Sequence, residues 1–228
     1  MGDIANNLVA VQSRVTAALA NTPNRSNNVQ ILAVSKQQSA AAIRTLAALG
    51  LRDFGENYLQ EALPKQQQLQ DLDLVWHFIG HIQTNKSRLV AQHFDWVHSV
   101  DRLKVAHRLN DQRPAELAAL NICLQVNISE EESKAGVAPA KAEELALAIT
   151  ELPHVKLRGL MAIPRTASDY DQQLQAFTQL KALFDSLNAS GLQLDTLSMG
   201  MSHDLEAALA AGATMLRIGQ ALFGPRAA

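Results

Sequence analysis

The feature that most constrains the fold is a regular alternation of strand-like and helix-like segments along the whole chain. Eight short apolar runs begin near residues 29, 51, 75, 96, 121, 156, 196 and 214, and a helix-like segment clearly follows each of the first seven. Alternation of this kind favours a parallel sheet, and eight units favour closure into a barrel. The length of 228 residues suits such a barrel. The sequence therefore predicts an α/β fold, a single (β/α)8 TIM barrel, with residues 1–228 as one domain.

The expected elements follow from the period of the apolar residues. We expect strands at residues 29–36, 51–55, 75–80, 96–100, 121–128, 156–162, 196–199 and 214–218. We expect helices between them at residues 40–49, 58–70, 85–93, 102–109, 140–152, 171–187 and 205–211. An extra N-terminal helix is predicted within residues 1–21, because apolar residues recur there at spacings of three and four. This helix lacks the basic start and the continuous apolar core of a signal peptide.

Charge and composition exclude several classes of function. The chain has 20 basic and 22 acidic residues, a net charge of -2, so we expect no nucleic acid and no anionic membrane as partner. No apolar run approaches the ~20 residues that a membrane span needs. Cys123 is the single cysteine and lies in a predicted strand, so we expect a small core residue. We therefore expect a soluble, cytoplasmic protein and a monomer.

The first predicted strand ends on a lysine. If Lys36 points into the barrel, the period of two sends Leu32 and Val34 inward as well, while Ala33 and Ser35 face the helices. Barrels of this class keep their chemistry at the C-terminal ends of the strands. Lys36 is therefore a candidate for chemistry, although a solvated surface amine is the plainer interpretation of a lysine at a strand end.

The last predicted strand brings a second cation to the same place. In a closed barrel the eighth strand lies beside the first, so Arg217 should come near Lys36. The loops at residues 198–202 and 217–220 follow strands seven and eight, where barrels commonly bind a phosphate. Their glycines allow close approach to an anion, and Ser202 offers a hydroxyl just before a helix start. A phosphate site beside a lysine is what pyridoxal phosphate (PLP) requires.

Plainer interpretations of these residues stay open. Gly200 and Gly219 are also typical turn residues, Arg217 is free to pair with an acid, and the pocket could suit another phosphorylated ligand. His77 and His81 suggest a metal, but no third ligand with metal spacing lies nearby. We therefore predict no metal, and we expect His77 to form hydrogen bonds inside the barrel.

Seven short blocks carry a family resemblance. They are AVSK at 33–36, FGENY at 54–58, WHFIG at 76–80, QTNK at 83–86, RGLM at 158–161, SMGMS at 198–202 and RIG at 217–219. In order and spacing, from about residue 29 to Arg226, they resemble the signature blocks of the YggS/PROSC family, the pyridoxal phosphate homeostasis proteins. Members resemble the barrel domain of the alanine racemase class, the fold-type III PLP proteins.

The resemblance implies PLP as cofactor and assigns roles to single residues. It implies cofactor contacts at Lys36, Asn57, Met161, Ser202, Arg217, Gly219 and Gln220. Lys36 would form the internal aldimine, Arg217 would face the pyridine nitrogen, and Ser202 with the backbone at 219–220 would hold the phosphate. Gln37 and Gln220 depart from the family pattern, which often has Thr at both positions. A backbone N–H contact at 220 does not depend on that side chain.

The expected function is to store, buffer or deliver PLP, with apo PLP-dependent enzymes as recipients and indirect effects on amino-acid and keto-acid metabolism. Racemisation needs an acid/base group on each face of the substrate. The racemases resembled here draw one such tyrosine from a second domain, whereas this chain ends at Ala228 and offers Tyr58 and Tyr170. A cation at Arg217 would also disfavour protonation of the pyridine nitrogen and weaken the electron sink. We therefore expect no enzyme and no catalytic residue. The alternative is a PLP-dependent amino-acid racemase, or another PLP enzyme, with weak activity.

Overall fold

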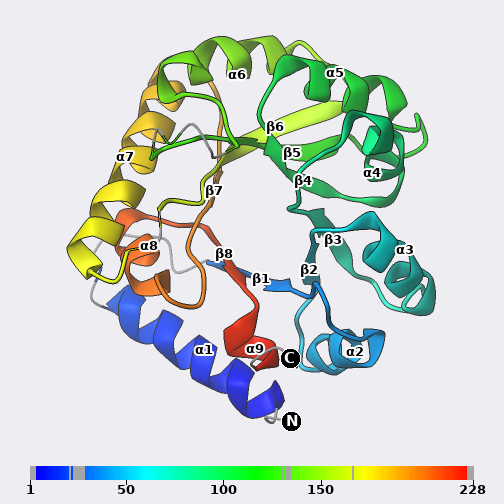
Figure 1. Ribbon diagram of the computed structural model, residues 1–228, viewed down its shortest axis with the longest axis vertical. Helices are drawn as coiled ribbons and strands as arrows, with labels where there is room; N and C mark the ends of the chain where they lie inside the picture. Colours follow the sequence, from blue (N-terminus) through cyan, green and yellow to red (C-terminus); the bar gives the residue numbers. More distant parts are fainter. Residues whose placement is uncertain are drawn as a thin grey trace.

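Eight parallel strands close into one barrel in sequence order, with helices around the outside (Figure 1). The computed structural model describes residues 4–20, 22, 29–129, 131, 135–165 and 167–224. The predicted α/β barrel is thus confirmed. Residues 1–3 and 21 of the predicted N-terminal helix, and Arg226 and Ala228, lie outside the described residues.

The elements follow the predicted order with small shifts at their ends. The strands are β1 Gln30–Val34, β2 Asp53–Glu56, β3 Val75–Phe78, β4 Trp96–Val100, β5 Leu120–Gln125, β6 Val155–Met161, β7 Thr196–Ser198 and β8 Met215–Ile218. The α-helices are α1 Ile4–Ala20, α2 Ala40–Ala48, α3 Leu59–Gln68, α4 Ser87–His93, α5 Leu103–Gln112, α6 Ala142–Thr150, α7 Tyr170–Ala189, α8 Leu205–Ala211 and α9 Gln220–Phe223. Short 3-10 turns, Thr84–Lys86 and Pro139–Lys141, precede α4 and α6. The sequence did not predict α9.

The barrel closes between its first and last strands. In the register of β1 and β8, Leu32 lies opposite Arg217 and Ala33 lies opposite Ile218. Lys36 follows the end of β1 by two residues. The predicted neighbourhood of strands one and eight is confirmed, and both deliver their cations at the same end of the barrel.

The apolar core has two compartments. The larger lies between the barrel and the helices and includes Ala33, while the smaller lies inside the barrel and joins Trp96, Cys123 and Met161. Gly55 on β2 lies opposite the buried His77 of β3, and a Cβ added at Gly55 would meet Leu32 at 3.4 Å, so Leu32 faces inward with them. Cys123 is fully buried, and this burial raises the pKa of its thiol to about 12. The predicted strand alternation and the core position of Cys123 are both confirmed.

One pair of strands approaches so closely that only glycine fits between them. A Cβ added at Gly159 on β6 would lie 1.7 Å from the backbone oxygen of Thr196 on β7. Real atoms of this kind do not approach to that distance, so the glycine allows β6 and β7 to pair. The requirement explains a glycine in the middle of a buried strand.

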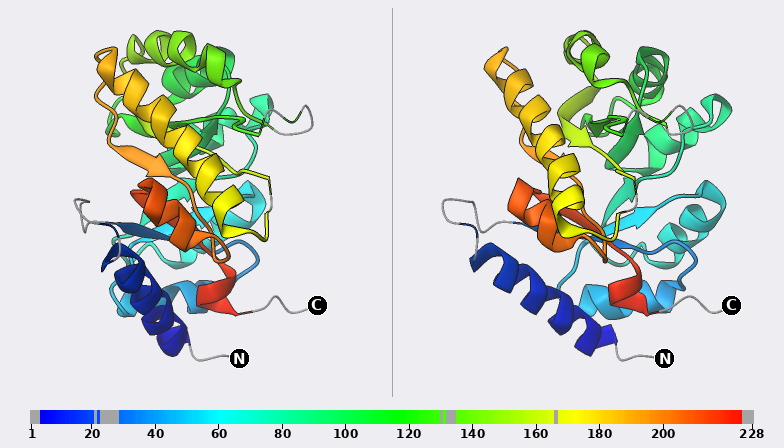
Figure 2. Two further views of the ribbon diagram at one scale, coloured as in Figure 1. Left: turned by 90° about the vertical axis from the view of Figure 1, so that its left-hand side faces the viewer. Right: turned by 60° about the vertical axis from the view of Figure 1, so that its left-hand side comes forward.

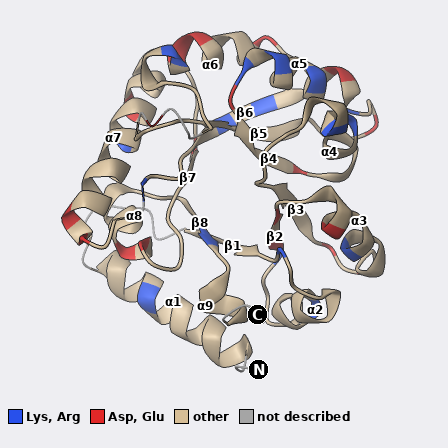
Figure 3. Cartoon of the chain, in the orientation of Figure 1, with Lys and Arg blue, Asp and Glu red and all other residues tan. Residues whose placement is uncertain are grey.

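The N-terminal helix α1 covers the side of the barrel near β8. It lies along α8 and α9 in each view (Figures 1 and 2). The Asn7 side chain donates a hydrogen bond of 2.9 Å to the backbone oxygen of Leu222 in α9, and Arg14 pairs with Glu206 of α8 at 2.8 Å. Charges of both signs are spread over the outer helices (Figure 3), and none of the described helices is long and apolar enough to cross a membrane.

Candidate functional site

A pocket of about 250 Å³ opens at the C-terminal end of the barrel. Its volume lies just below the usual range for small-molecule sites, ~300–1,000 Å³, which suits a small ligand with one ring. All seven residues implied by the resemblance line it: Lys36, Asn57, Met161, Ser202, Arg217, Gly219 and Gln220. The structure therefore brings together residues that are spread over most of the chain.

The same pocket contains residues that sequence reasoning missed. Val34, Ile79, Ile163 and Met201 give it an apolar wall, and His203 adds an imidazole to the lining. His203 directly follows Ser202, so its place beside a predicted loop residue was a usable signal. The apolar residues carried no such signal, because Val and Ile at strand ends are equally typical of a core.

The residue before Lys36 is held by a buried ion pair. Ser35 donates from its hydroxyl to Glu56 Oε1 at 2.6 Å. Lys65 Nζ of α3 donates to the backbone oxygen of Ser35 and to Glu56 Oε1, each at 2.8 Å. Burial raises the pKa of the Glu56 carboxyl, outweighing the hydrogen bonds from Lys65 and Ser35 that lower it. This network fixes the backbone from which Lys36 projects.

The residue after Lys36 has an unusual backbone. Among the described residues other than glycine, Gln37 is the one with a positive φ, which is 62°. Its N–H donates to Glu61 Oε2 of α3 at 2.7 Å. The left-handed region is costly for a residue with a side chain, and such residues cluster at functional sites. Lys36 therefore sits between two backbone positions that are both tied to α3.

Arg217 is a buried cation with neutral partners. Its Nη1 donates to the backbone oxygen of Ser198 and, at 2.9 Å, to the Ser198 hydroxyl, while Nη2 donates to the Ala162 oxygen at 2.9 Å. Burial lowers the pKa of the Arg217 guanidinium to about 10, so it stays charged at neutral pH. In these hydrogen bonds Arg217 does not pair with an acid. They use three of its five N–H groups, and Arg217 also lines the pocket.

Two loops near the C-terminal end of the sequence, after β7 and β8, also line the pocket and support each other. The Ser202 hydroxyl accepts from the Ala221 N–H at 3.2 Å, which joins the loop after β7 to the start of α9. The Ser202 backbone oxygen accepts from Arg14 Nη1 at 3.1 Å, which joins the same loop to α1. Because the hydroxyl accepts in the first of these bonds, it can still donate its own hydrogen to a ligand.

The helix that follows Ser202 has an acid at its start. Asp204 precedes α8, and its Oδ1 accepts from the Met201 N–H at 2.5 Å. Burial raises the pKa of this carboxyl. The Met201 N–H is therefore already satisfied within the loop, and the predicted phosphate contact at the Gly219 and Gln220 turn does not depend on it.

The residues present fit PLP. Lys36, His203 and Arg217 line the pocket, and its described lining includes no carboxylate, so the lining suits an anionic ligand. Asn57 also lines the pocket, and its Oδ1 is buried without a hydrogen-bond partner. Buried polar atoms are nearly always satisfied in native proteins, so an orphaned oxygen at a pocket indicates a missing ligand contact.

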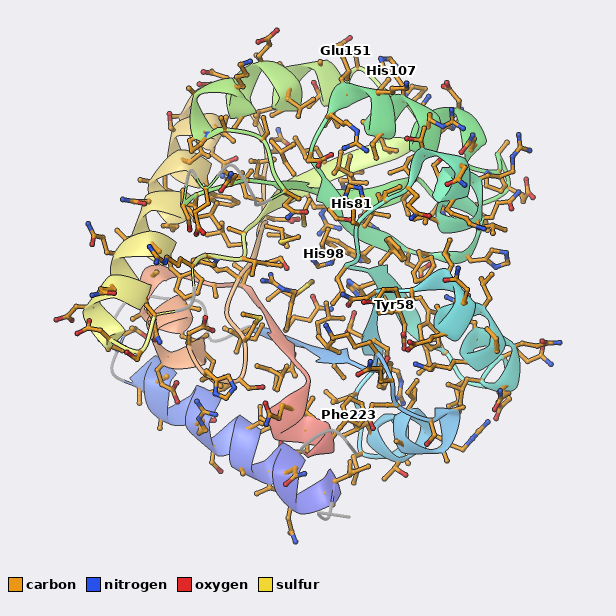
Figure 4. The ribbon with its side chains drawn as sticks, in the orientation of Figure 1. Tyr58, His81, His98, His107, Glu151 and Phe223 are labelled. Carbon is orange, nitrogen blue, oxygen red and sulfur yellow. The ribbon has the colours of Figure 1, made fainter. Side chains whose placement is uncertain are left out.

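Larger cavities lie elsewhere but lack this chemistry. One of about 560 Å³ lies along α7 and is lined by glutamines such as Gln172 and Gln175. Another, of about 370 Å³, shares Asn57 with the pocket and includes Tyr58 and His81, which are labelled in Figure 4. Neither places a lysine beside a buried arginine, so we assign the site to the smaller pocket.

His77 belongs to a hydrogen-bond network inside the barrel, as predicted. Its Nε2 lies 2.9 Å from Asp53 Oδ1, and its Nδ1 lies 3.0 Å from His98 Nε2. Within the described ranges, no group of three or more His, Cys, Asp or Glu side chains is arranged to hold a metal ion.

Comparison with known proteins relates this pocket to a family. The family model described as alanine racemase, N-terminal domain, matches residues 7–227. The pyridoxal phosphate homeostasis protein of Pseudomonas aeruginosa is 57% identical over 226 residues, which cover 99% of this chain and 97% of that protein. This chain belongs to the pyridoxal phosphate homeostasis protein family. The member from Escherichia coli K12 is 51% identical over 229 residues, which cover 99% of this chain and 98% of that protein.

Solved structures agree with this family assignment. PipY of Synechococcus elongatus, solved with PLP bound, is 39% identical with a TM-score of 0.84, covering 97% of this chain and 100% of its own. Alanine racemase of Clostridium difficile has a TM-score of 0.76 over all of this chain and 58% of its own, at 14% identity, and shares the fold. The predicted family and its barrel are thus confirmed.

Proposed function

We propose that this chain binds PLP in the pocket at the C-terminal end of the barrel, and that it stores, buffers or delivers the cofactor. The observation that carries the proposal is the convergence of Lys36, Ser202 and Arg217 on one small pocket without a described carboxylate. The PLP-bound structure of PipY, at 39% identity, and the names of the curated relatives support it.

Each residue has a role that follows from its position. Bound PLP supplies an aldehyde that reacts with a primary amine, and a phosphate that anchors it. Lys36 offers the amine, while the Ser202 hydroxyl and the backbone at Gly219 and Gln220 donate hydrogen bonds to the phosphate. The Arg217 guanidinium, which lines the same pocket, would face the ring nitrogen. Asn57 and Met161 complete the lining, and Asn57 gains a partner for its buried oxygen.

The surroundings of the pocket favour a carrier over an enzyme. A charged Arg217 beside the ring nitrogen disfavours protonation of that nitrogen, which weakens the ring as an electron sink. Tyr58 lies in the neighbouring cavity and Tyr170 begins α7, so neither belongs to the described lining. His203 does line the pocket, and the alternative of a weak racemase would need it as the second acid/base group beside Lys36.

The proposal extends to the setting of the protein. We propose one domain over residues 1–228, a cytoplasmic monomer, and apo PLP-dependent enzymes as recipients of the cofactor.

The decisive experiment traps the bound cofactor. Borohydride reduction of protein loaded with PLP, followed by peptide mapping, is expected to place the adduct on Lys36, because its amine shares the pocket with Arg217 and Ser202. Lys36→Ala should lose both the visible absorption band and the adduct. Lys86→Ala, at the lysine of the neighbouring cavity, should keep both. An adduct on Lys86, or an unchanged band in Lys36→Ala, would contradict the assignment.

The same loaded protein separates a carrier from an enzyme. We expect no racemase, transaminase or decarboxylase turnover, and transfer of PLP to an apo-enzyme faster than from free solution. Turnover of an amino acid at the ~1–10³ s⁻¹ common among enzymes, lost in His203→Ala, would favour the racemase alternative instead.

A further inference from the structure

A chain of hydrogen bonds crosses the inside of the barrel and ends at Arg217. Asp53 Oδ1 lies 2.9 Å from His77 Nε2, His77 Nδ1 lies 3.0 Å from His98 Nε2, and His98 Nδ1 lies 2.7 Å from the Ser198 hydroxyl. That hydroxyl accepts from Arg217 Nη1 at 2.9 Å. We refer to Asp53, His77, His98, Ser198 and Arg217 as the relay.

The relay occupies space that barrels usually fill with apolar side chains. Its members come from β2, β3, β4, β7 and β8, and His98 lies within the ring of strands in Figure 4. Branched apolar residues dominate the interior layers of most barrels of this class. Buried polar groups are retained at low cost only when they satisfy one another, which the relay does from end to end.

The two ends of the relay fix the direction of every bond between them. A guanidinium can only donate and an ionised carboxylate can only accept. Arg217 therefore donates to Ser198, Ser198 donates to His98 Nδ1, His98 donates from Nε2 to His77 Nδ1, and His77 donates from Nε2 to Asp53. Both neutral histidines are then in the Nε2–H form. The reverse direction would set a lone pair of His77 against the carboxylate.

Burial and neighbouring charges keep the interior members neutral and the end member charged. Burial lowers the pKa of His77, against the opposing effects of Asp53 and Asp95. Burial lowers the pKa of His98 well below its ordinary value, and the positive charge of Arg217 lowers it further. Burial alone would raise the pKa of Asp53, but hydrogen bonds from His77 and Gln30 outweigh it, so the carboxyl has a lowered pKa.

Packing holds the rings in the orientation that the relay requires. The His77 ring stacks on Trp96, with ring centres 5.5 Å apart and planes at 14°. Both histidines are completely buried, so neither ring can turn toward solvent. The direction of the hydrogen bonds is therefore a fixed property of the barrel interior.

We propose that Asp53, His77, His98 and Ser198 are positioning residues for Arg217. The carboxylate at the N-terminal end of the barrel sets the direction of the relay, and the relay orients the Arg217 guanidinium at the opposite end. Ser198 and the Ala162 oxygen hold Nη1 and Nη2, and this fixes the guanidinium where it lines the pocket. The relay itself is independent of any ligand, and its effect on PLP rests on the proposed function.

The first test uses the protein without cofactor. Nitrogen-15 NMR of labelled histidines should find His77 and His98 in the neutral Nε2–H form between roughly pH 6 and 8, the range in which an ordinary histidine changes charge. Asp53→Asn should disturb both signals, because an amide can donate as well as accept and so permits the reverse direction. Asp195→Asn is the matched control, since Asp195 lies at the same end of the barrel but pairs with Arg158. A protonated ring, an Nδ1–H form, or unchanged signals in Asp53→Asn would overturn the proposal.

The second test adds PLP. Ser198→Ala and Asp53→Asn should weaken PLP binding by up to about tenfold and should shift the visible band. The effect is limited because Arg217 keeps its bonds to the backbone oxygens of Ser198 and Ala162. Ser198→Thr retains the hydroxyl and should keep both the affinity for PLP and the position of the visible band. Asp195→Asn should bind PLP as the wild type does. Equal bands and affinities in all variants would overturn the link from the relay to the pocket. If wild-type protein shows no visible band with PLP, the proposed function is overturned instead. The nitrogen-15 spectra without cofactor would still show whether the relay has the proposed direction.

Discussion

At the scale of single residues, Ser202 shows how the pocket divides its work between side chain and backbone. Its hydroxyl joins the α9 start through Ala221, and its backbone oxygen is fixed by Arg14 of α1. A phosphate held here would receive one hydroxyl donor and several backbone donors. Truncation of a side chain leaves the backbone donors in place, so the phosphate site should resist the loss of any one side chain.

This division gives a quantitative prediction for binding. A hydrogen bond to a charged group contributes ~1.5–3 kcal/mol. At the lower end of that range, Ser202→Ala should weaken PLP binding about tenfold and keep the visible band at high PLP. Pyridoxal without its phosphate loses all of these bonds and should bind at least ~100-fold more weakly. Titration of the visible band measures both values, with Ser190→Ala, on an exposed serine, as control. Equal affinity for pyridoxal and PLP would show that these loops hold no phosphate.

At the scale of elements, the pairing of β6 with β7 depends on Gly159. The Cβ of any other residue would meet the backbone of Thr196, the residue with which Gly159 pairs across the two strands. Gly55 on β2 offers a contrast, because a Cβ there would meet the side chains of Ile79 and Leu32 at 3.3 and 3.4 Å. Side chains can shift slightly where backbone cannot.

The two glycines should therefore differ sharply on substitution. We expect Gly159→Ala to lower the free energy of unfolding by about 3 kcal/mol or more, and Gly55→Ala to lower it by about 1 kcal/mol or less. Urea unfolding of both variants measures the difference. Similar stabilities would show that β6 and β7 separate easily, contrary to their contact in the structure.

The elements also show how far the sequence alone could go. The order of strands and the identity of the strand-end residues follow from periodicity and from the rule that barrels bind ligands at the C-terminal ends of strands. The four-residue helix α9 was missed because it is too short to show a period. The contact between His98 and Ser198 was missed because the period of two places both inside the barrel but does not say which residues, 100 positions apart, meet across it.

At the scale of the whole molecule, the buried histidines make stability depend on pH. Both have lowered pKa values in the folded protein, whereas an unfolded chain returns them to about 6.5. Below that pH the unfolded chain binds protons that the folded protein does not. The contribution of these histidines to the free energy of unfolding should therefore be fully present above about pH 6.5. Below that pH it should fall by up to about 1.4 kcal/mol per pH unit for each histidine.

Comparison of variants isolates this contribution. His98→Asn removes one of the two buried histidines that take up a proton on unfolding. The fall of the free energy of unfolding with acid should therefore be less steep by up to about 1.4 kcal/mol per pH unit. Carboxyl groups such as Glu56, with its raised pKa, contribute equally to both proteins and cancel in the difference. His107→Asn, on the exposed face of α5, is the control and should leave the slope unchanged (Figure 4). Equal slopes in wild type and His98→Asn would contradict the neutral state of His98.

The closure of the barrel between β1 and β8 has a consequence for how the protein is made. Lys36 is added to the growing chain about 180 residues before Arg217 and Gly219. At ~5–20 residues per second, the amine precedes its partners by roughly ten seconds or more. A nascent chain therefore offers cofactor an ordinary lysine without a phosphate site, and we expect only released, closed barrels to retain it.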